Sequence, residues 1–213
     1  MARREKGRAA VLLACGLACL VAQVVEAGQP DLGVVVEILN YAGLPGGTLE
    51  RAESEAARVF GRAGVKLEWL EPEVATEGAG LQLAGSLQRA QVCYLKLLPD
   101  SMFGQLQLPT RVLGVARGAY IYVSVESALE LSLAVGADLP VVLGHVMAHE
   151  IGHVLLGSNA HALGTVMTPQ LGRRELQTAA RGHLLFSQAQ AKRMRERIQA
   201  QQAAETAVLV ARK

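Results

Sequence analysis

The sequence predicts an α+β domain in which a twisted mixed sheet packs on a buried helix, with a further helix towards the C-terminus. A strand, a helix and a second strand follow one another with short joints over residues 32–70, a crossover unit that places two parallel strands in one sheet. Residues 140–156 have the length of a helix and are apolar around most of its circumference, which is typical of a helix in the interior of a fold. A last helix is expected over residues 187–204.

The spacing of apolar and polar residues is regular throughout the first crossover unit. Residues 32–39 are apolar enough for a strand that is buried on both faces. The helix that follows should start at Thr48 as its N-cap and end before Gly64, since apolar residues recur there at helical spacing. Residues 65–70 alternate between apolar and polar, as a half-buried strand does.

The rest of the chain is less regular. Residues 71–88 are rich in glutamate, glycine and glutamine and indicate a loop, and residues 101–113 show no clear period. Further strands are expected over 92–98 and 119–125, and helices over 126–135 and, after Asp138 as a cap, over 140–156. The second of these strands is our candidate for a sheet edge to which an extended peptide adds by main-chain pairing. The stretch up to Gly182 is ambiguous.

The N-terminal segment has the pattern of a secretory signal peptide. A basic start is followed by an apolar run over residues 9–25, and small residues precede an expected cleavage between Ala27 and Gly28. We therefore expect export to the periplasm or the extracellular space; an uncleaved membrane anchor is the alternative. The expected organisation is a signal peptide over 1–27, one domain over 28–204 and a frayed tail over 205–213.

Composition excludes several classes of protein. The 213 residues are 51% hydrophobic and 19% charged, which is too apolar and too weakly charged for a disordered chain. The signal segment takes four of the 21 basic and two of the 19 acidic residues with it, so the remaining chain is neutral. A neutral chain lacks the basic field that dominates affinity for nucleic acids, which makes DNA and RNA poor candidates for partners.

The chemistry is concentrated in the buried helix. Four of the five histidines fall between residues 145 and 161, and His149-Glu150-Ile151-Gly152-His153 has the H-E-x-x-H pattern. Residues four apart project from one face of a helix, so both imidazoles can bind the same zinc ion. Glu150 is rotated by about 100° from His149. The carboxylate can therefore flank the metal and accept a proton from a zinc-activated water as general base.

Residues beyond the helix extend this pattern. Gly157, His161 and Met167 follow in His-Glu-Ile-Gly-His-Val-Leu-Leu-Gly-Ser-Asn-Ala-His-Ala-Leu-Gly-Thr-Val-Met, and the segment 145–168 resembles the metzincin class of zinc peptidases. The resemblance implies a zincin fold, His149, His153 and His161 as zinc ligands, and Met167 as the methionine of the turn below the metal.

The spacing departs from the metzincin motif, which would place glycine at position 156 and the third histidine at position 159. These positions hold Leu156 and Asn159. The glycine lies one position later and the third histidine two positions later than in the motif. We prefer His161 to Asn159 as the third ligand. A carboxylate third ligand from a later helix, Glu175, is the thermolysin-like alternative.

Two further residues have alternative roles. His145 lies one turn before His149 and is expected either to line or support the site or to be a surface or capping histidine. Cys93 lies in an apolar strand and is expected to be a core residue rather than a ligand that blocks the zinc.

The sequence thus predicts an exported zinc-dependent endopeptidase. Its cofactor is Zn²⁺, its general base is Glu150, and its partner is a peptide or protein substrate; a membrane is a partner only if the N-terminal segment stays uncleaved. The alternative is a non-catalytic zinc-binding or peptide-binding module on the same fold.

Overall fold

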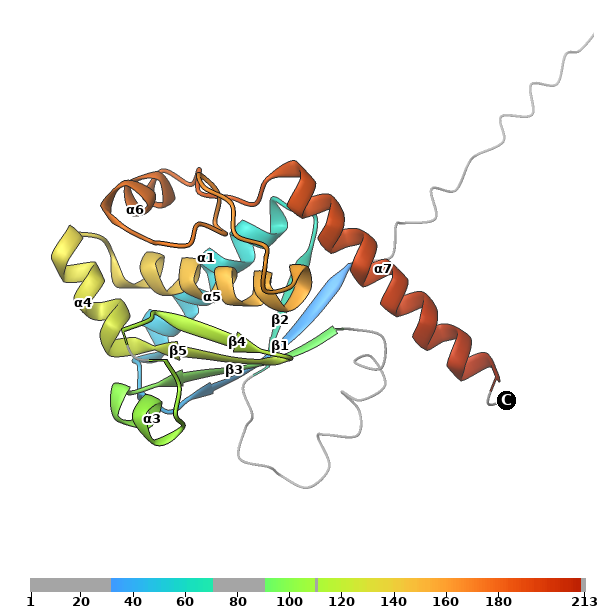
Figure 1. Ribbon diagram of the computed structural model, residues 1–213, viewed down its shortest axis with the longest axis horizontal. Coiled ribbons are helices and arrows are strands. Elements are labelled where there is room, and N and C mark those ends of the chain that lie inside the picture. Colours follow the sequence, from blue (N-terminus) through green and yellow to red (C-terminus); the bar gives the residue numbers. More distant parts are fainter. Residues whose placement is uncertain (1–31, 71–90, 110, 212–213) are drawn as a thin grey trace, which may run out of the picture.

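The fold is α+β, as predicted, with one five-stranded mixed sheet packed on a central helix (Figure 1). The computed structural model describes residues 32–70, 91–109 and 111–211; the expected signal peptide and the expected loop at 71–88 lie outside the described residues. The strands are β1 Gly33–Asn40, β2 Lys66–Leu70, β3 Gln91–Leu98, β4 Gly114–Arg117 and β5 Tyr120–Ser124. The helices are α1 Gly46–Gly61, α3 Asp100–Gln105, α4 Val125–Val135, α5 Leu139–Leu156, α6 Arg173–Ala180 and α7 Gln188–Ala211.

The sheet has the strand order β2-β1-β3-β5-β4. Strands β1 and β2 are parallel, with Val34 opposite Leu67, so the predicted crossover unit is confirmed. Strand β1 also pairs in parallel with β3, and β3 with β5. Val34, Val35 and Val36 are all at most 1% exposed, which confirms that β1 is buried on both faces.

The edge of the sheet beside α5 is not the one we expected. The predicted strand at 119–125 is β5, which pairs with β3 on one side and with β4 on the other, so it lies inside the sheet. The edge is β4, an antiparallel strand joined to β5 by a tight turn in which Gly118 has φ +62°. A strand of four residues is too short to show a two-residue period, so no alternating pattern marks it in the sequence.

Helix boundaries show three further differences. Thr48 was wrong as the N-cap of α1: the helix begins at Gly46 after Pro45, and the backbone N–H of Thr48 donates to the Pro45 carbonyl oxygen at 2.9 Å. The short helices α3 and α6 lie in stretches that we left irregular or ambiguous, since six and eight residues offer few positions for a helical period. Helix α7 continues to Ala211 instead of ending near Ala204, as its alanine- and glutamine-rich sequence favours.

Helix α5 is the centre of the molecule. It contacts α1, α4, α6 and α7 and also three strands of the sheet, and Figure 1 shows it lying over the sheet beside α1. Among the described helices it is the one long and apolar enough to cross a membrane, but 72% of it is buried within the fold. The prediction of a buried apolar helix is thus confirmed, and its length and hydropathy are those of a core helix.

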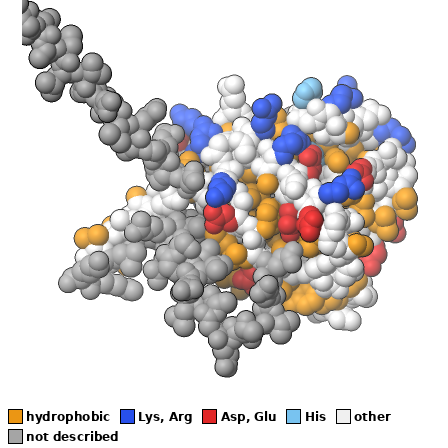
Figure 2. All heavy atoms as spheres, turned by 180° about the vertical axis from the view of Figure 1, so that it is seen from behind, with side chains coloured by type: hydrophobic (Ala, Val, Ile, Leu, Met, Phe, Trp, Pro, Cys, Tyr) orange, Lys and Arg blue, Asp and Glu red, His pale blue; other side chains and the backbone are white. Residues whose placement is uncertain are grey.

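Charged side chains are mixed on the surface behind α5. In the view from behind, Lys and Arg side chains lie next to Asp and Glu side chains, without a continuous area of one sign (Figure 2). Opposite charges also meet in the ion pairs between Arg58 and Glu55 and between Lys66 and Glu68.

Helices α1 and α5 approach each other closely at Gly144. A Cβ atom on Gly144 would lie 2.6 Å from the Cβ of Glu55 and 2.7 Å from the carbonyl oxygen of Ala52. Both atoms are fixed to the α1 backbone, so the contact cannot be relieved by rotation of a side chain. Only glycine therefore allows the two helices to pack at this distance.

We expect Gly144→Ala to lower the free energy of unfolding by about 1–3 kcal/mol, as overpacking of a core contact does. Gly61→Ala is the matched control, because a Cβ there meets nothing within 4 Å and alanine favours the helix by up to about 1 kcal/mol. Urea denaturation of both variants measures the difference. Equal stability of the two variants would contradict the tight helix contact.

Candidate metal centre

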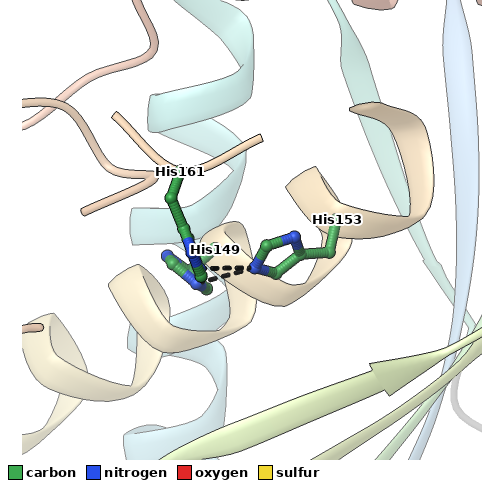
Figure 3. Close-up of side chains that lie close together, drawn as sticks. All are labelled: His149, His153 and His161. Carbon is green, nitrogen blue, oxygen red and sulfur yellow. Dashed lines mark hydrogen bonds between the residues drawn. The ribbon is translucent and has the colours of Figure 1, made fainter. Parts of the chain in front are cut away.

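Three imidazoles converge at the C-terminal half of α5. His149 and His153 project from one face of the helix, one turn apart, and their Nε2 atoms are 3.0 Å apart. His161 comes from the loop after α5, and its Nε2 lies 3.1 Å from that of His153. Figure 3 shows the three rings turned towards one another. Within the residues described, these three form a group whose ligand atoms all lie within 4.8 Å of one another.

The spacing of these nitrogen atoms fits a small metal ion. A tetrahedral ion with bonds of about 2.0–2.1 Å to imidazole nitrogen, as for zinc, holds its ligand atoms about 3.3 Å apart. The two short Nε2–Nε2 distances are close to this value. The arrangement suits one ion between three ligands.

Hydrogen bonds at the other ring nitrogens support the same interpretation. His149 Nδ1 lies 2.9 Å from the carbonyl oxygen of Val166, and His153 Nδ1 lies 3.2 Å from that of Gly157. A carbonyl oxygen only accepts, so each Nδ1 carries the proton and donates, and each Nε2 presents a lone pair. Lone pairs that face one another repel unless a cation or a proton lies between them.

Burial keeps two of the imidazoles neutral. Loss of hydration lowers the pKa of His149 to about 4 and also lowers the pKa of His153. Neutral imidazole is the form that binds a metal ion. The pair on α5 is therefore in the ligand form at neutral pH.

The loop after α5 turns back towards the helix. Gly157 ends α5 with φ +93°, and its backbone N–H donates to the carbonyl oxygen of His153 at 2.9 Å. The turn exposes Asn159 and buries Ala160, and the next residue is His161. The displaced spacing noted in the sequence therefore still brings His161 to the two histidines of α5.

Glu175, the alternative third ligand, is not brought to the histidines. It lies in the first turn of α6, where its Oε2 accepts the backbone N–H of Gly172 at 3.1 Å. This bond gives the carboxylate a role at the helix N-terminus. Among the described residues, the group that could hold a metal contains His161 and not Glu175.

Met167 lies directly beneath the helix. It is fully buried, and a Cβ on Gly152 would lie 2.5 Å from its Sδ atom. The turn that carries it is held by a hydrogen bond from the Ala162 N–H to the Met167 carbonyl oxygen at 2.9 Å. The preceding residue, Val166, accepts the hydrogen bond from His149. The turn thus orients the ring of His149 and supports α5 from below.

Glu150 is buried against the edge strand. Its side chain is next to Gly114, where a Cβ would lie 2.8 Å from the Glu150 Cγ, and its carboxylate accepts a hydrogen bond from the Ala116 backbone. Burial raises its pKa to about 8, against the smaller opposite effect of that hydrogen bond. Nothing in the sequence indicated Gly114 or Ala116 as neighbours of Glu150, because these contacts join β4 to a helix that lies far from it along the chain.

His145 is a buried residue and not a surface one. Its side chain is fully buried, its Nδ1 lies 2.9 Å from the Val141 carbonyl oxygen, and Glu55 Oε1 is 3.5 Å away. Burial is also the main cause that lowers its pKa. Of the two alternatives for His145, the surface or capping histidine is therefore wrong, whereas the expectation that it lines the site is confirmed, since His145 is among the residues that line the cleft around the three histidines.

Cys93 is a fully buried residue of β3, as predicted. Burial raises the pKa of its thiol to about 12, so the thiol stays protonated at neutral pH. A protonated, enclosed thiol is a packing residue and not a metal ligand.

A cleft of about 1090 Å³ joins these parts. Its lining includes the three converging histidines, Glu150, residues 114–116 of β4, and residues 168–172 after the methionine turn. The candidate ligands and the carboxylate thus face one space that is bordered by the edge strand β4.

No protein-family model and no curated protein matches the chain. Several chains of solved structures are similar to this one, and two of them are as follows. A zinc-dependent peptidase from Methanocorpusculum labreanum (strain Z) is similar over 75% of this chain and 99% of its own, with 14% identity and a TM-score of 0.48. Archaemetzincin from Methanopyrus kandleri is similar over 80% of this chain and 98% of its own, with 17% identity and a TM-score of 0.45.

We expect the purified protein to bind one Zn²⁺ per chain, and His161→Ala to weaken this binding by at least about 100-fold because one of three ligands is lost. His183→Ala is the matched control, since His183 is exposed and lies outside the histidine group. Competition with a chromophoric chelator measures the affinity. Unchanged zinc affinity in His161→Ala would contradict the third ligand.

Proposed function

We propose that the chain is a zinc-dependent endopeptidase with a metzincin-like site. The observation that carries this proposal is the convergence of His149, His153 and His161 in a cleft that Glu150 also lines. A structural zinc site with four protein ligands has no use for such a carboxylate, whereas a catalytic site keeps a position open for water or substrate.

The chemistry would be divided between the metal and the protein. Zn²⁺, held by the three Nε2 atoms, would supply a Lewis acid that polarises the scissile carbonyl and makes water more acidic. Glu150 would take the proton of the attacking water and deliver it to the leaving nitrogen.

The edge strand would hold the substrate. Strand β4 pairs with β5 on one side, and its residues 114–116 line the cleft. An extended peptide that adds to this edge by main-chain hydrogen bonds would pass the three histidines with chain on both sides of the scissile bond. This geometry favours cleavage within a chain over removal of a terminal residue.

Export remains part of the proposal. It is supported by the basic and apolar pattern of residues 1–27 and by the small residues before Gly28. A secreted or periplasmic peptidase would meet peptides and proteins as substrates, and the near balance of basic and acidic residues argues against nucleic acid as a partner. An anchored form of the same enzyme would have an uncut N-terminal segment.

We expect Glu150→Gln to lower peptide hydrolysis by about 10²–10⁴-fold, since the amide has a similar shape but cannot accept the proton. Zinc should stay bound, because Glu150 is not among the three ligands. Cleavage of a quenched fluorescent peptide library and zinc stoichiometry are measured on the same samples. Glu130→Gln, at an exposed position of α4, serves as the control and should retain full activity.

Retention of hydrolysis in Glu150→Gln would overturn the assignment of the general base. Loss of zinc together with activity would show a structural role for the carboxylate. Zinc binding without hydrolysis in the wild type would favour the alternative, a non-catalytic binding module.

We expect Gly114→Ala to impair hydrolysis more than zinc binding. The added Cβ would lie 2.8–3.1 Å from three atoms of the Glu150 side chain, so the carboxylate must move while the histidines keep their places. A displacement of about 1 Å at a catalytic group costs up to about 100-fold in rate. Gly104→Ala, where nothing lies within 4 Å of the added Cβ, is the control.

A loss of zinc affinity equal to the loss of rate in Gly114→Ala would argue against a specific effect on Glu150. The zinc affinity and the hydrolysis rate of each variant are each divided by the wild-type value, and the two ratios are compared. The melting temperature of the metal-free protein shows whether the fold is kept.

A further inference from the structure

We propose that Gln190, in the first turn of α7, is a positioning residue that holds the loop of His161 at the metal centre; this rests on the proposed zinc site. Gln190 is buried, with 6% of the residue exposed. Its Nε2 donates to the carbonyl oxygen of Ala160 at 3.1 Å, across a separation of 30 residues. Ala160 is the residue directly before the third candidate ligand.

His161 depends on such support more than the other two histidines do. His149 and His153 are fixed by the backbone of a buried helix, whereas His161 is exposed and lies in a loop. On the far side of His161, the N–H of Ala162 donates to the Met167 carbonyl oxygen at 2.9 Å. The bond from Gln190 to Ala160 and the bond from Ala162 to Met167 thus hold the backbone on both sides of His161.

The side-chain amide of Gln190 forms hydrogen bonds with two segments of the chain. Its Oε1 accepts the backbone N–H of Ser187 at 2.9 Å, and the Ser187 Oγ accepts the backbone N–H of Gln190 at 3.2 Å. This pair of bonds is a capping box for α7 and needs only the oxygen of the side chain. The NH₂ group is not needed for the cap, and it donates to the ligand loop instead.

Burial makes the orientation of this amide specific. A buried amide that lacks a partner is destabilising, so the rotamer that satisfies both Ser187 and Ala160 is strongly favoured. Helix α7 also contacts the start of the loop, where Arg193 Nη2 donates to the Leu156 carbonyl oxygen at 3.3 Å. The first turns of α7 therefore fix both ends of the loop over residues 157–160.

The test compares the zinc affinity of Gln190→Met with that of Ser187→Ala. Methionine has a similar length but neither donor nor acceptor, so the bond to Ala160 is lost. Ser187→Ala removes the hydroxyl half of the cap and leaves that bond in place. We expect Gln190→Met to weaken zinc binding by about 10-fold or more, as for other groups that orient a ligand, and Ser187→Ala to stay within about twofold of the wild type.

A double-mutant cycle separates positioning from a general effect on folding. In a His161→Ala background there is no third ligand to orient, so Gln190→Met should have no further effect on zinc affinity. An effect as large as in the wild-type background would overturn the proposal. The same holds if Ser187→Ala weakens zinc binding as much as Gln190→Met does.

A milder variant keeps the test open if Gln190→Met does not fold. Gln190→Asn retains the amide but shortens the side chain by one methylene, so it cannot reach Ala160 while it caps α7, and it should also weaken zinc binding. Wild-type zinc affinity in Gln190→Asn or Gln190→Met would overturn the role of Gln190 alone. Absence of zinc binding in the wild type would instead overturn the metal site, and this inference with it.

Discussion

The arrangement of the structure depends on the hydrogen-bond partners that a few polar side chains need on an otherwise apolar helix. Helix α5 is the centre of the core and yet carries His145, His149 and Glu150 on buried or half-buried positions. Each polar atom in such a place needs a partner, because an unpaired one costs several kcal/mol in an apolar environment. One polar atom of each of these side chains has such a partner, from Val141 on α5 itself, Val166 of the methionine turn and Ala116 of β4, respectively. The surrounding elements are therefore arranged by the hydrogen bonds that this helix needs as well as by its apolar surface.

Sequence reasoning succeeded where the signal is local. The helical spacing of His149 and His153 places both on one face without knowledge of any other part of the chain. The buried strand β1 and the crossover to β2 could be predicted because long apolar and alternating runs have a clear period. The core position of Cys93 follows from its apolar neighbours in the same way.

The rest depends on contacts between distant segments. The contact of Gly114 with Glu150 joins a four-residue strand to a helix. A strand this short and a single glycine do not allow that contact to be predicted from the sequence. Gln190 reaches Ala160 from another helix and resembles an ordinary cap residue when only its neighbours are considered. The sequence already favours His161 over Glu175, but the position of His161 beside the other two histidines depends on the path of the loop after Gly157, which is set by tertiary packing and not by spacing alone.

The two glycines of α5 have a consequence for the order in which the molecule assembles. Gly144 and Gly152 allow the close contacts with α1 and with Met167, but each disfavours helix formation by about 1 kcal/mol relative to alanine. An isolated peptide with this sequence would therefore be a poor helix, and the two histidines would not be prearranged in the unfolded chain. Helix and ligand pair form together with the surrounding core, so an ion that binds the three histidines would select the folded state and raise its stability by mass action. Metal binding at the three histidines and the stability of the fold would then be thermodynamically linked.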